Sequence, residues 1–341
     1  MSENVLIIGG GLSGLVAGYR LSFNKNLKVT ILEKEKNLGG LAASFEKNGE
    51  VFPLAYHHIM PSDTNVLSLI KELGLERKFF TKKTKIRFMW QNKFFPLKSP
   101  IDILLFKPLS FKSRIKLAIL GLKSLLIKDW ALYDNISAKD WIIKSAGIEL
   151  YEKVFSPLLE SKFSSDATKI SASWIGYRLA SRESKGNFGY LRGGISLIIK
   201  KLEETIIKNG GDIIKEAKLN KISITKSSAT QVGYKIKNKK FVIKTDSIIS
   251  TIPTPLFLSS LKKKDEEIFS YLRKIKYKSA ISCIVALDKK VTPFYWINLI
   301  NSEKNALSFK AIFDHSSLNP YVNGGNSVLY LITYLNKNDS F

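Results

Sequence analysis

Cysteine is almost absent from this chain, whose 341 residues include one, Cys283. A single thiol cannot form an intrachain disulfide, and it cannot provide a cysteine cluster that binds a metal. Its neighbours in residues 279–286 are apolar or small, which predicts a buried strand. We therefore expect Cys283 to be an inert thiol in the core.

Long apolar runs and targeting signals are also absent. No uncharged run reaches the ~18 residues that indicate a transmembrane helix. The first four residues lead straight into an apolar run, without the basic region and small-residue cleavage site of a signal peptide. These absences predict a cytoplasmic protein that is soluble or held peripherally at the inner face of the membrane.

Acidic residues are few, since 29 Asp and Glu stand against 54 Lys and Arg, a formal net charge of +25. Such an excess attracts anionic lipid or nucleic acid. Only eight of the 54 are arginine, however, and the lysines are dispersed along the chain. Nucleic-acid recognition favours arginine and a localised basic patch, so we predict no nucleic-acid partner. A solvated surface and an anionic membrane surface both remain open.

The N-terminal region carries a glycine motif. Val5–Ile8 is a short apolar run suited to a buried parallel strand, and Gly9, Gly11 and Gly14 follow it with the spacing G-x-G-x-x-G. The first glycine allows a tight turn, the second lets the backbone approach a pyrophosphate, and the third lets a helix pack on the strand. The motif predicts a dinucleotide site.

A helix start and a carboxylate extend this site. Leu12 and Ser13 begin the following helix, whose N–H groups and positive dipole end suit phosphate. The next strand, residues 28–32, ends at Glu33, 19 residues after Gly14. A carboxylate there accepts hydrogen bonds from an adenosine ribose and disfavours the 2′-phosphate of NADP.

A glycine doublet follows the carboxylate, because residues 34–42 run from Lys34 to Gly39, Gly40 and Leu41. This segment resembles the second signature of the amine oxidase/protoporphyrinogen oxidase superfamily of FAD enzymes, which includes carotenoid desaturases and is related to UDP-galactopyranose mutases. The resemblance implies FAD as the cofactor and places the doublet near its flavin end. It also implies that Lys34, Gly39, Gly40 and Leu41 belong to the cofactor site.

The resemblance covers nearly the whole chain and implies an α/β fold. We expect a Rossmann-type FAD-binding domain with a mostly parallel sheet in two parts, residues 1–63 and 186–255. An interleaved substrate domain would comprise a mostly helical insertion at 64–185 and strands at 256–341. Full-length relatives continue with one more FAD-binding segment, so we expect this chain to be truncated at its C-terminus.

Two cofactor contacts in the second FAD-binding part are implied by the same resemblance. The backbone at Leu219 would lie against the adenine. The apolar run at 248–250, followed by Thr251 and Pro253, would pass near the cofactor.

His57 and His58 are two of the three histidines. They lie in residues 45–63, which resemble the family segment that passes beside the flavin ring. Adjacent side chains point in different directions in an extended segment, so the two histidines make a poor metal pair and we predict no metal site. Either histidine could donate a hydrogen bond to flavin or substrate, and a purely structural role is equally open.

In the insertion, residues 65–73 predict a helix that ends at Gly74, and residues 85–90 and 93–96 predict a hairpin joined by Gln91 and Asn92. Residues 113–128 predict an amphipathic helix. Packing against the domain core and attachment to an anionic membrane surface are both consistent with it. Most basic residues lie away from the apolar stripe, which consists of Ile115, Ala118, Ile119, Leu122, Leu125 and Leu126.

Residues 171–178, together with Arg182, resemble the family's substrate-cap region. Arg178 and Arg182 lie four residues apart in this segment. At this spacing they share one helix face. Arginine is scarce here, and its fork geometry suits a carboxylate or a phosphate, so Arg178 is a candidate for substrate binding or catalysis. An ordinary surface ion pair would give the same pattern.

The functional expectation is an FAD-dependent oxidoreductase that oxidises a hydrophobic or cyclic small molecule by hydride transfer to the flavin. Two alternatives stay open: a flavin-dependent UDP-sugar mutase, which performs no net oxidation, and a flavoprotein-fold remnant without turnover. The sequence gives neither the substrate nor the oligomeric state.

Overall fold

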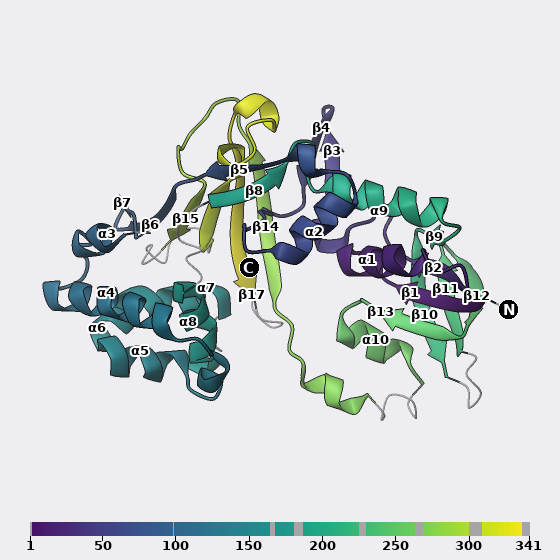
Figure 1. Cartoon of the computed structure of the whole chain (residues 1–341), viewed down its shortest axis with the longest axis horizontal. Coiled ribbons are helices and arrows are strands. Elements are labelled where there is room, and N and C mark those ends of the chain that lie inside the picture. Colours follow the sequence, from purple (N-terminus) through teal and green to yellow (C-terminus); the bar gives the residue numbers. More distant parts are fainter. Residues whose placement is uncertain are drawn as a thin grey trace. The chain divides into compact units, whose positions relative to one another are not determined.

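The computed structural model describes residues 2–97, 99–163, 168–180, 187–224, 230–262, 269–299 and 309–335 (Figure 1). The chain divides into two compact units. Unit 1 comprises residues 1–57, 64–79 and 191–276, and unit 2 comprises residues 58–63, 80–190 and 277–341.

Unit 1 is built around a parallel four-stranded sheet in the order β13-β1-β2-β9. Its strands are β1 (Glu3–Ile8), β2 (Leu27–Leu32), β9 (Asp212–Ile214) and β13 (Ser247–Ser250). The last four residues of both β1 and β2 are buried, as expected for strands covered on both faces. The helices α1 (Leu12–Leu21) and α9 (Ser196–Lys208) pack against each other and against strands of this sheet. The predicted parallel sheet is confirmed.

A three-stranded antiparallel sheet packs beside the parallel one in unit 1. It consists of β10 (Ala217–Ser223), β11 (Thr230–Ile236) and β12 (Lys239–Thr245). Their apolar residues share a core with those of the parallel sheet, which includes Leu6, Ile8, Leu32, Ala217, Ile222 and Val232. Smaller elements of the unit are the hairpin of β3 (Ser44–Lys47) and β4 (Glu50–Pro53), and α10 (Thr254–Ser260).

The helix α2 (Thr64–Glu72) belongs to unit 1, although we expected the substrate domain to begin at residue 64. Arg20 of α1 donates hydrogen bonds to the Glu72 carboxylate, which ties α2 to the helix that packs on the parallel sheet. Gly74, with φ 68°, follows the helix as the predicted stop. The chain passes from unit 2 to unit 1 after residue 190 and returns to unit 2 after residue 276. The expected boundaries were 185 and 255.

Unit 2 contains a mixed six-stranded sheet in the order β14-β17-β16-β15-β6-β7. The pair β15-β6 is parallel and the other pairs are antiparallel. Gln91 (φ 45°) and Asn92 (φ 58°) join β6 to β7, which confirms the predicted two-residue hairpin. Unit 2 also pairs β5 (Phe79–Lys83) with β8 (Asn187–Leu191). The six strands are β6 (Ile86–Trp90), β7 (Lys93–Phe95), β14 (Ser279–Ala286), β15 (Trp296–Leu299), β16 (Ala311–Asp314) and β17 (Val328–Leu335).

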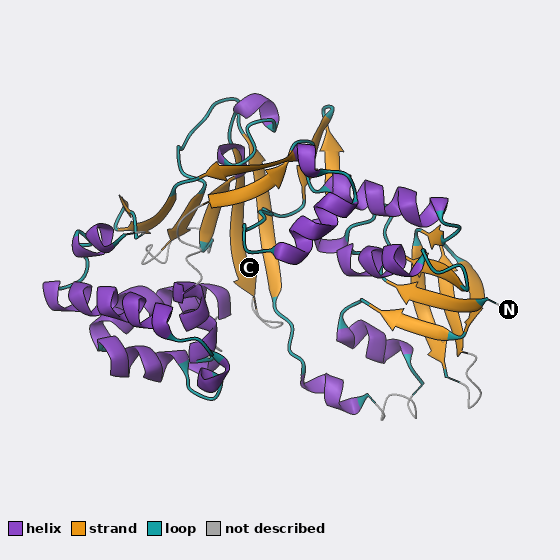
Figure 2. Ribbon diagram, viewed as in Figure 1, coloured by secondary structure: helices purple, strands orange, loops and turns teal. Residues whose placement is uncertain are grey.

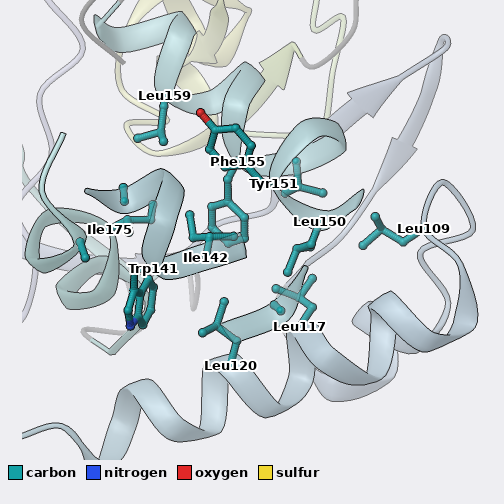
Figure 3. Packing of buried hydrophobic residues seen from close by; sticks show 14 of the residues in the cluster. Leu109, Leu117, Leu120, Trp141, Ile142, Leu150, Tyr151, Phe155, Leu159 and Ile175 are labelled. Atoms are coloured by element: carbon teal, nitrogen blue, oxygen red, sulfur yellow. The ribbon is translucent and has the colours of Figure 1, made fainter. Parts of the chain in front are cut away.

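The predicted helical insertion forms a helical layer within unit 2, in which the helices gather apart from the strands (Figure 2). Its buried core includes Trp141, Leu150, Phe155 and Ile175 (Figure 3). Trp130 belongs to the same core. The layer consists of α3 (Pro100–Leu104), α4 (Phe111–Leu126), α5 (Ala138–Ala146), α6 (Ile148–Leu150), a π-helical turn (Tyr151–Phe155), α7 (Ser156–Phe163) and α8 (Ala172–Ala180).

The expected apolar stripe of α4 does not face this core. The buried residues of α4 are Ser113, Leu117, Leu120 and Ser124. Ile115, Ile119, Leu122, Leu125 and Leu126 are instead 39%, 44%, 61%, 41% and 80% exposed. The helix therefore packs on the domain core, as one of the two alternatives held, but through Leu117 and Leu120 and not through the predicted stripe.

Cys283 is exposed, so the predicted core thiol is also wrong. The surrounding strand was predicted correctly, because residues 279–286 form β14. β14 lies at one end of the six-stranded sheet order, with β17 as its neighbour there. Apolar residues in an edge strand need not be buried, since such a strand is covered less completely than a central one.

Within the residues that the structure describes, no helix has the length and apolar character needed to cross a membrane.

Candidate functional site

The first turn of unit 1 is built around Gly9 and Gly14. Gly9 has φ 110°, a conformation that favours glycine. A Cβ atom at Gly14 would lie 1.9 Å from the Gly9 carbonyl oxygen, so α1 packs against the turn more closely than any side chain allows. These two glycines perform the turn and packing roles that their spacing predicted.

Gly11 differs from both, because its surroundings are open. Its φ of −70° is accessible to any residue, and a Cβ atom there would have no neighbour nearer than the Gly40 Cα, at 3.8 Å. Gly11 caps α1, which begins with Leu12 and Ser13. The first N–H groups of a helix have no acceptor within the helix, so they are available to an anion. Open space beside these N–H groups fits a pyrophosphate.

Glu33 holds the backbone of the glycine turn in place through its carboxylate. Its side chain is buried, and its carboxylate accepts hydrogen bonds from the Gly10 N–H at 2.7 Å and from the Glu35 N–H at 2.9 Å. A carboxylate has about four lone-pair positions, so capacity remains for a ribose diol. The sequence predicted the ribose contact and did not predict this bracing of the backbone.

The glycine doublet lies directly against the turn formed by Gly9–Gly14. The Gly39 N–H donates to the Gly10 carbonyl at 2.8 Å, and Gly11 and Gly39 form an isolated parallel bridge. A Cβ atom at Gly39 would lie 2.4 Å from Cδ1 of Ile199, a residue of α9 that sequence analysis missed. The doublet and the turn therefore form one backbone cradle, defined here by Gly9–Gly14, Glu33, Gly39 and Gly40.

The two neighbours of this cradle predicted to bind the cofactor are both exposed. Leu41 is 89% exposed. Lys34 pairs with Glu35 at 3.1 Å, and both side chains are more than half exposed. At such exposure the ion pair contributes little to stability, about 0–1 kcal/mol.

Thr251 and Leu219 lie beside the cradle in different ways. The Thr251 hydroxyl is within 3.1 Å of the carbonyl oxygens of Ile8 and Gly9, so it braces the turn through hydrogen bonds. Leu219 lies in β10, opposite Tyr234 and at a register shift. The start of β10 reaches Glu33, since the Ala217 N–H donates to the Glu33 carbonyl at 2.7 Å.

His57 and His58 lie in separate surroundings. In unit 1, Nε2 of His57 hydrogen-bonds the Leu41 carbonyl at 2.8 Å, next to the glycine doublet. In unit 2, Nδ1 of His58 hydrogen-bonds the hydroxyl of Tyr295 at 2.9 Å. The His58 ring lies 4.1 Å from that of Phe188, centroid to centroid. Sequence analysis missed Tyr295 and Phe188, which no local pattern connects to His58.

Arg178 lies on α8 in the helical layer, with its guanidinium 4.3 Å from the centre of the Trp174 ring. This stacking is a cation–π interaction. Arg182, with which it was expected to share a helix face, lies outside the described residues. Among described residues, no group of three or more His, Cys, Asp or Glu is arranged to hold a metal ion.

Residues 12–341 match the protein family described as flavin containing amine oxidoreductase. The chain belongs to this family. It is 26% identical to the coproporphyrinogen III oxidase of Staphylococcus aureus over 327 residues, which cover 85% of this chain and 68% of that protein. It is 22% identical to protoporphyrinogen oxidase 1 of Spinacia oleracea over 323 residues, which cover 84% of this chain and 56% of that protein.

A solved structure matches nearly the whole length of this chain. The crystal structure of reduced UDP-galactopyranose mutase matches with a TM-score of 0.74 at 16% identity, covering 99% of this chain and 74% of that one. Family membership confirms the predicted flavin oxidoreductase class and FAD as the cofactor. The fold of this neighbour is the predicted α/β fold of FAD-binding proteins.

Proposed function

We propose that this chain oxidises a hydrophobic, cyclic small molecule by hydride transfer to FAD, and that the substrate belongs to the porphyrinogen class. The family match over residues 12–341 carries the proposal. The names of the two curated relatives support the substrate class. Bound FAD would supply a two-electron acceptor for a hydride that leaves a C–H or N–H bond.

The backbone cradle of unit 1 would hold the nucleotide half of FAD. The N–H groups of Leu12 and Ser13 would face the pyrophosphate, and the open side of Gly11 would let it approach. Glu33 would accept hydrogen bonds from the ribose. The backbone of β10 near Leu219 would lie beside the adenine.

The two histidines would position the backbone and the substrate through hydrogen bonds. Neither needs to react as a nucleophile. His57 holds the Leu41 carbonyl and so fixes the segment after the doublet. His58, whose ring orientation is set by Tyr295 and Phe188, is the proposed substrate-side residue. Arg178, whose guanidinium lies over the Trp174 ring, would face an anionic group of the substrate.

The second candidate is a flavin-dependent UDP-sugar mutase. The fold likeness to UDP-galactopyranose mutase over 99% of this chain favours it. A mutase returns its flavin to the starting oxidation state in each cycle, so this candidate differs from the first in producing no net oxidation. The third candidate is a chain that binds FAD without turnover.

Anaerobic flavin reduction distinguishes the three. The FAD-loaded chain is mixed without oxygen with coproporphyrinogen III and, separately, with UDP-galactopyranose, while flavin absorbance is recorded. We expect coproporphyrinogen III to bleach the flavin and to yield an oxidised product. Isomerisation of the UDP-sugar without net oxidation would replace the first candidate with the second. Bleaching by dithionite alone, with neither substrate changed, would support a chain without turnover.

A further inference from the structure

Unit 1 contains a cavity of about 510 Å³ that lies apart from the backbone cradle. Its lining residues come from four strands that lie together in this unit, β1, β2, β9 and β12 (Figure 1). The cradle follows the C-terminal ends of β1 and β2, at Gly9 and Glu33, whereas the cavity lies toward the N-terminal ends of these two strands. The cavity is therefore a second concave site, separate from the one assigned to FAD.

The alternation of side chains along the strands decides which of them enter the cavity. Leu6 and Ile8 of β1 belong to the core shared with the antiparallel sheet, and Asn4 points to the same face because it lies two residues before Leu6. In the β1–β2 register Asn4 pairs with Lys28, so the Lys28 side chain also points there. Thr30, two residues further along β2, does the same. This face carries the core toward one end of the strands and the cavity toward the other.

Charged side chains stand where the cavity opens to solvent. Lys28, Asp212 and Lys244 line the cavity and are exposed. Asp212 lies opposite Thr30 in the β2–β9 register, so it shares the face that carries Lys28. Two ammonium groups and one carboxylate give the lining a formal charge of +1. This balance favours an anionic group at the opening.

The inner wall of the cavity is apolar and held in place by hydrogen bonds. Leu6 is fully buried, and Ile214 and Ile243 are half-buried. The hydroxyl of Thr245, a residue that is 3% exposed, lies 2.7 Å from the carbonyl oxygen of Asn4. This hydrogen bond fixes the end of β12 against the start of β1. The wall is thus preformed, as is usual for small-molecule sites.

We propose that this cavity binds a small amphipathic molecule that has an apolar body and one carboxylate. The body would lie against Leu6 and Ile243, and the carboxylate would face the ammonium groups of Lys28 and Lys244. Small-molecule sites commonly have volumes of roughly 300–1,000 Å³, a range that includes this cavity. Charge complementarity selects a carboxylate over an ammonium group, because the two lysines outnumber Asp212. The proposal is independent of the flavin chemistry.

Titration calorimetry of the FAD-loaded chain with 2-naphthoate tests this site, since bound FAD keeps the probe out of the cradle. 2-Naphthylmethanol and 2-naphthylmethylamine keep the apolar body and change the charge of its polar end. We expect one 2-naphthoate per chain, with a dissociation constant of ~1 mM or tighter. The alcohol is expected to bind at least about fivefold more weakly, because it loses the charge-assisted contacts, and the amine more weakly still.

Variants of the lining assign the binding to this cavity. Lys28→Gln with Lys244→Gln is expected to reduce the affinity for 2-naphthoate to that of the alcohol. Lys218→Gln with Lys240→Gln is the matched control, because it makes the same charge change at exposed positions of β10 and β12 outside the cavity lining. It is expected to bind 2-naphthoate like the parent. Thr30→Phe fills part of the cavity and is expected to weaken binding of both the acid and the alcohol about tenfold or more.

Equal affinity for 2-naphthoate in the parent and in Lys28→Gln with Lys244→Gln would overturn the proposal, because the probe would then bind elsewhere. A parent chain that binds none of the three probes would overturn it as well and would leave the cavity to water. Tighter binding of the amine than of the acid would assign the site to a cation held by Asp212 and would contradict the anionic class.

Discussion

Gly11 and Gly14 lie three residues apart in one motif, yet a Cβ atom would meet very different surroundings at each. At Gly14 it would overlap the Gly9 carbonyl oxygen, at 1.9 Å. At Gly11 it would enter space in which the nearest atom is 3.8 Å away. Gly14 is thus required by the fold, whereas the packing of the fold does not require a glycine at position 11.

Gly14→Ala is therefore expected to destabilise the chain severely, by about 3 kcal/mol or more, because helix and turn must separate. Gly11→Ala is expected to leave the thermal midpoint of the flavin-free chain within about 2 °C of the parent. Thermal unfolding followed by circular dichroism measures both. Equal midpoints for the two variants would contradict the assignment of Gly14 to packing.

Glu33→Ala removes a ribose acceptor and leaves the buried N–H of Gly10 without its partner. Loss of a charge-assisted hydrogen bond of ~1.5–3 kcal/mol is expected to weaken FAD binding about ten- to a hundredfold. The orphaned N–H is expected to lower stability by ~1–3 kcal/mol as well. Glu35→Ala is the control, since its side chain is 65% exposed, and it should change neither quantity. An unchanged dissociation constant for FAD in Glu33→Ala would remove Glu33 from the site.

At the scale of elements, the packing of α8 depends on one glycine. A Cβ atom at Gly176 would lie 1.9 Å from Cζ3 of the buried Trp130. Gly176→Ala is expected to lower the free energy of unfolding by ~1–3 kcal/mol, despite the better helix propensity of alanine. Gly121 in α4 has nothing within 4 Å of that position, so Gly121→Ala should stabilise by up to about 1 kcal/mol. Chemical denaturation compares the two, and opposite signs are the expected result.

The N-terminus of α4 is anchored by Glu149. Its carboxylate accepts hydrogen bonds from the hydroxyls of Ser110 and Ser113 and from the Ser110 N–H, and it pairs with Lys153. These hydrogen bonds hold the pKa of Glu149 well below its usual value of 4.5. A carboxyl with a lowered folded-state pKa stabilises the fold above its unfolded pKa, and this contribution is lost as the pH falls below it.

The thermal midpoint of the parent is therefore expected to fall between pH 6 and pH 3 more steeply than that of Glu149→Gln. The difference between the two profiles should shrink toward the acid end. Parallel profiles over this range would show that Glu149 contributes no pH-dependent stability.

Local signals predicted many elements from the sequence. The turn residues Gln91 and Asn92 and the helix stop at Gly74 each depend on a few neighbouring residues, and all three hold in the structure. Periodicity predicted α4 but could not say which side of the helix is buried, because an apolar stripe can face a core or a membrane. The same limit explains Cys283, since a run of apolar residues does not reveal whether its strand lies at a sheet edge.

At the scale of the whole molecule, contacts between residues distant in sequence hold candidate residues in place within each unit. His58 and Tyr295 are 237 residues apart, and Thr251 reaches the Gly9 carbonyl across 242 residues. Such pairs follow from tertiary packing, for which no local spacing gives a signal. The glycine motif, the carboxylate and the doublet could be assigned beforehand because backbone geometry and a family resemblance constrain these positions.

The assignment of the FAD site to the backbone cradle of unit 1 is the central claim, and titration calorimetry with FAD on the flavin-free chain tests it most directly. The parent should bind one FAD per chain, and Gly11→Val should lose this binding while keeping the parent's thermal midpoint. Gly233→Val is the control in the same unit, because a Cβ atom there would have no neighbour nearer than 3.7 Å, so it should bind FAD like the parent. Unchanged FAD affinity in a folded Gly11→Val chain would contradict the claim.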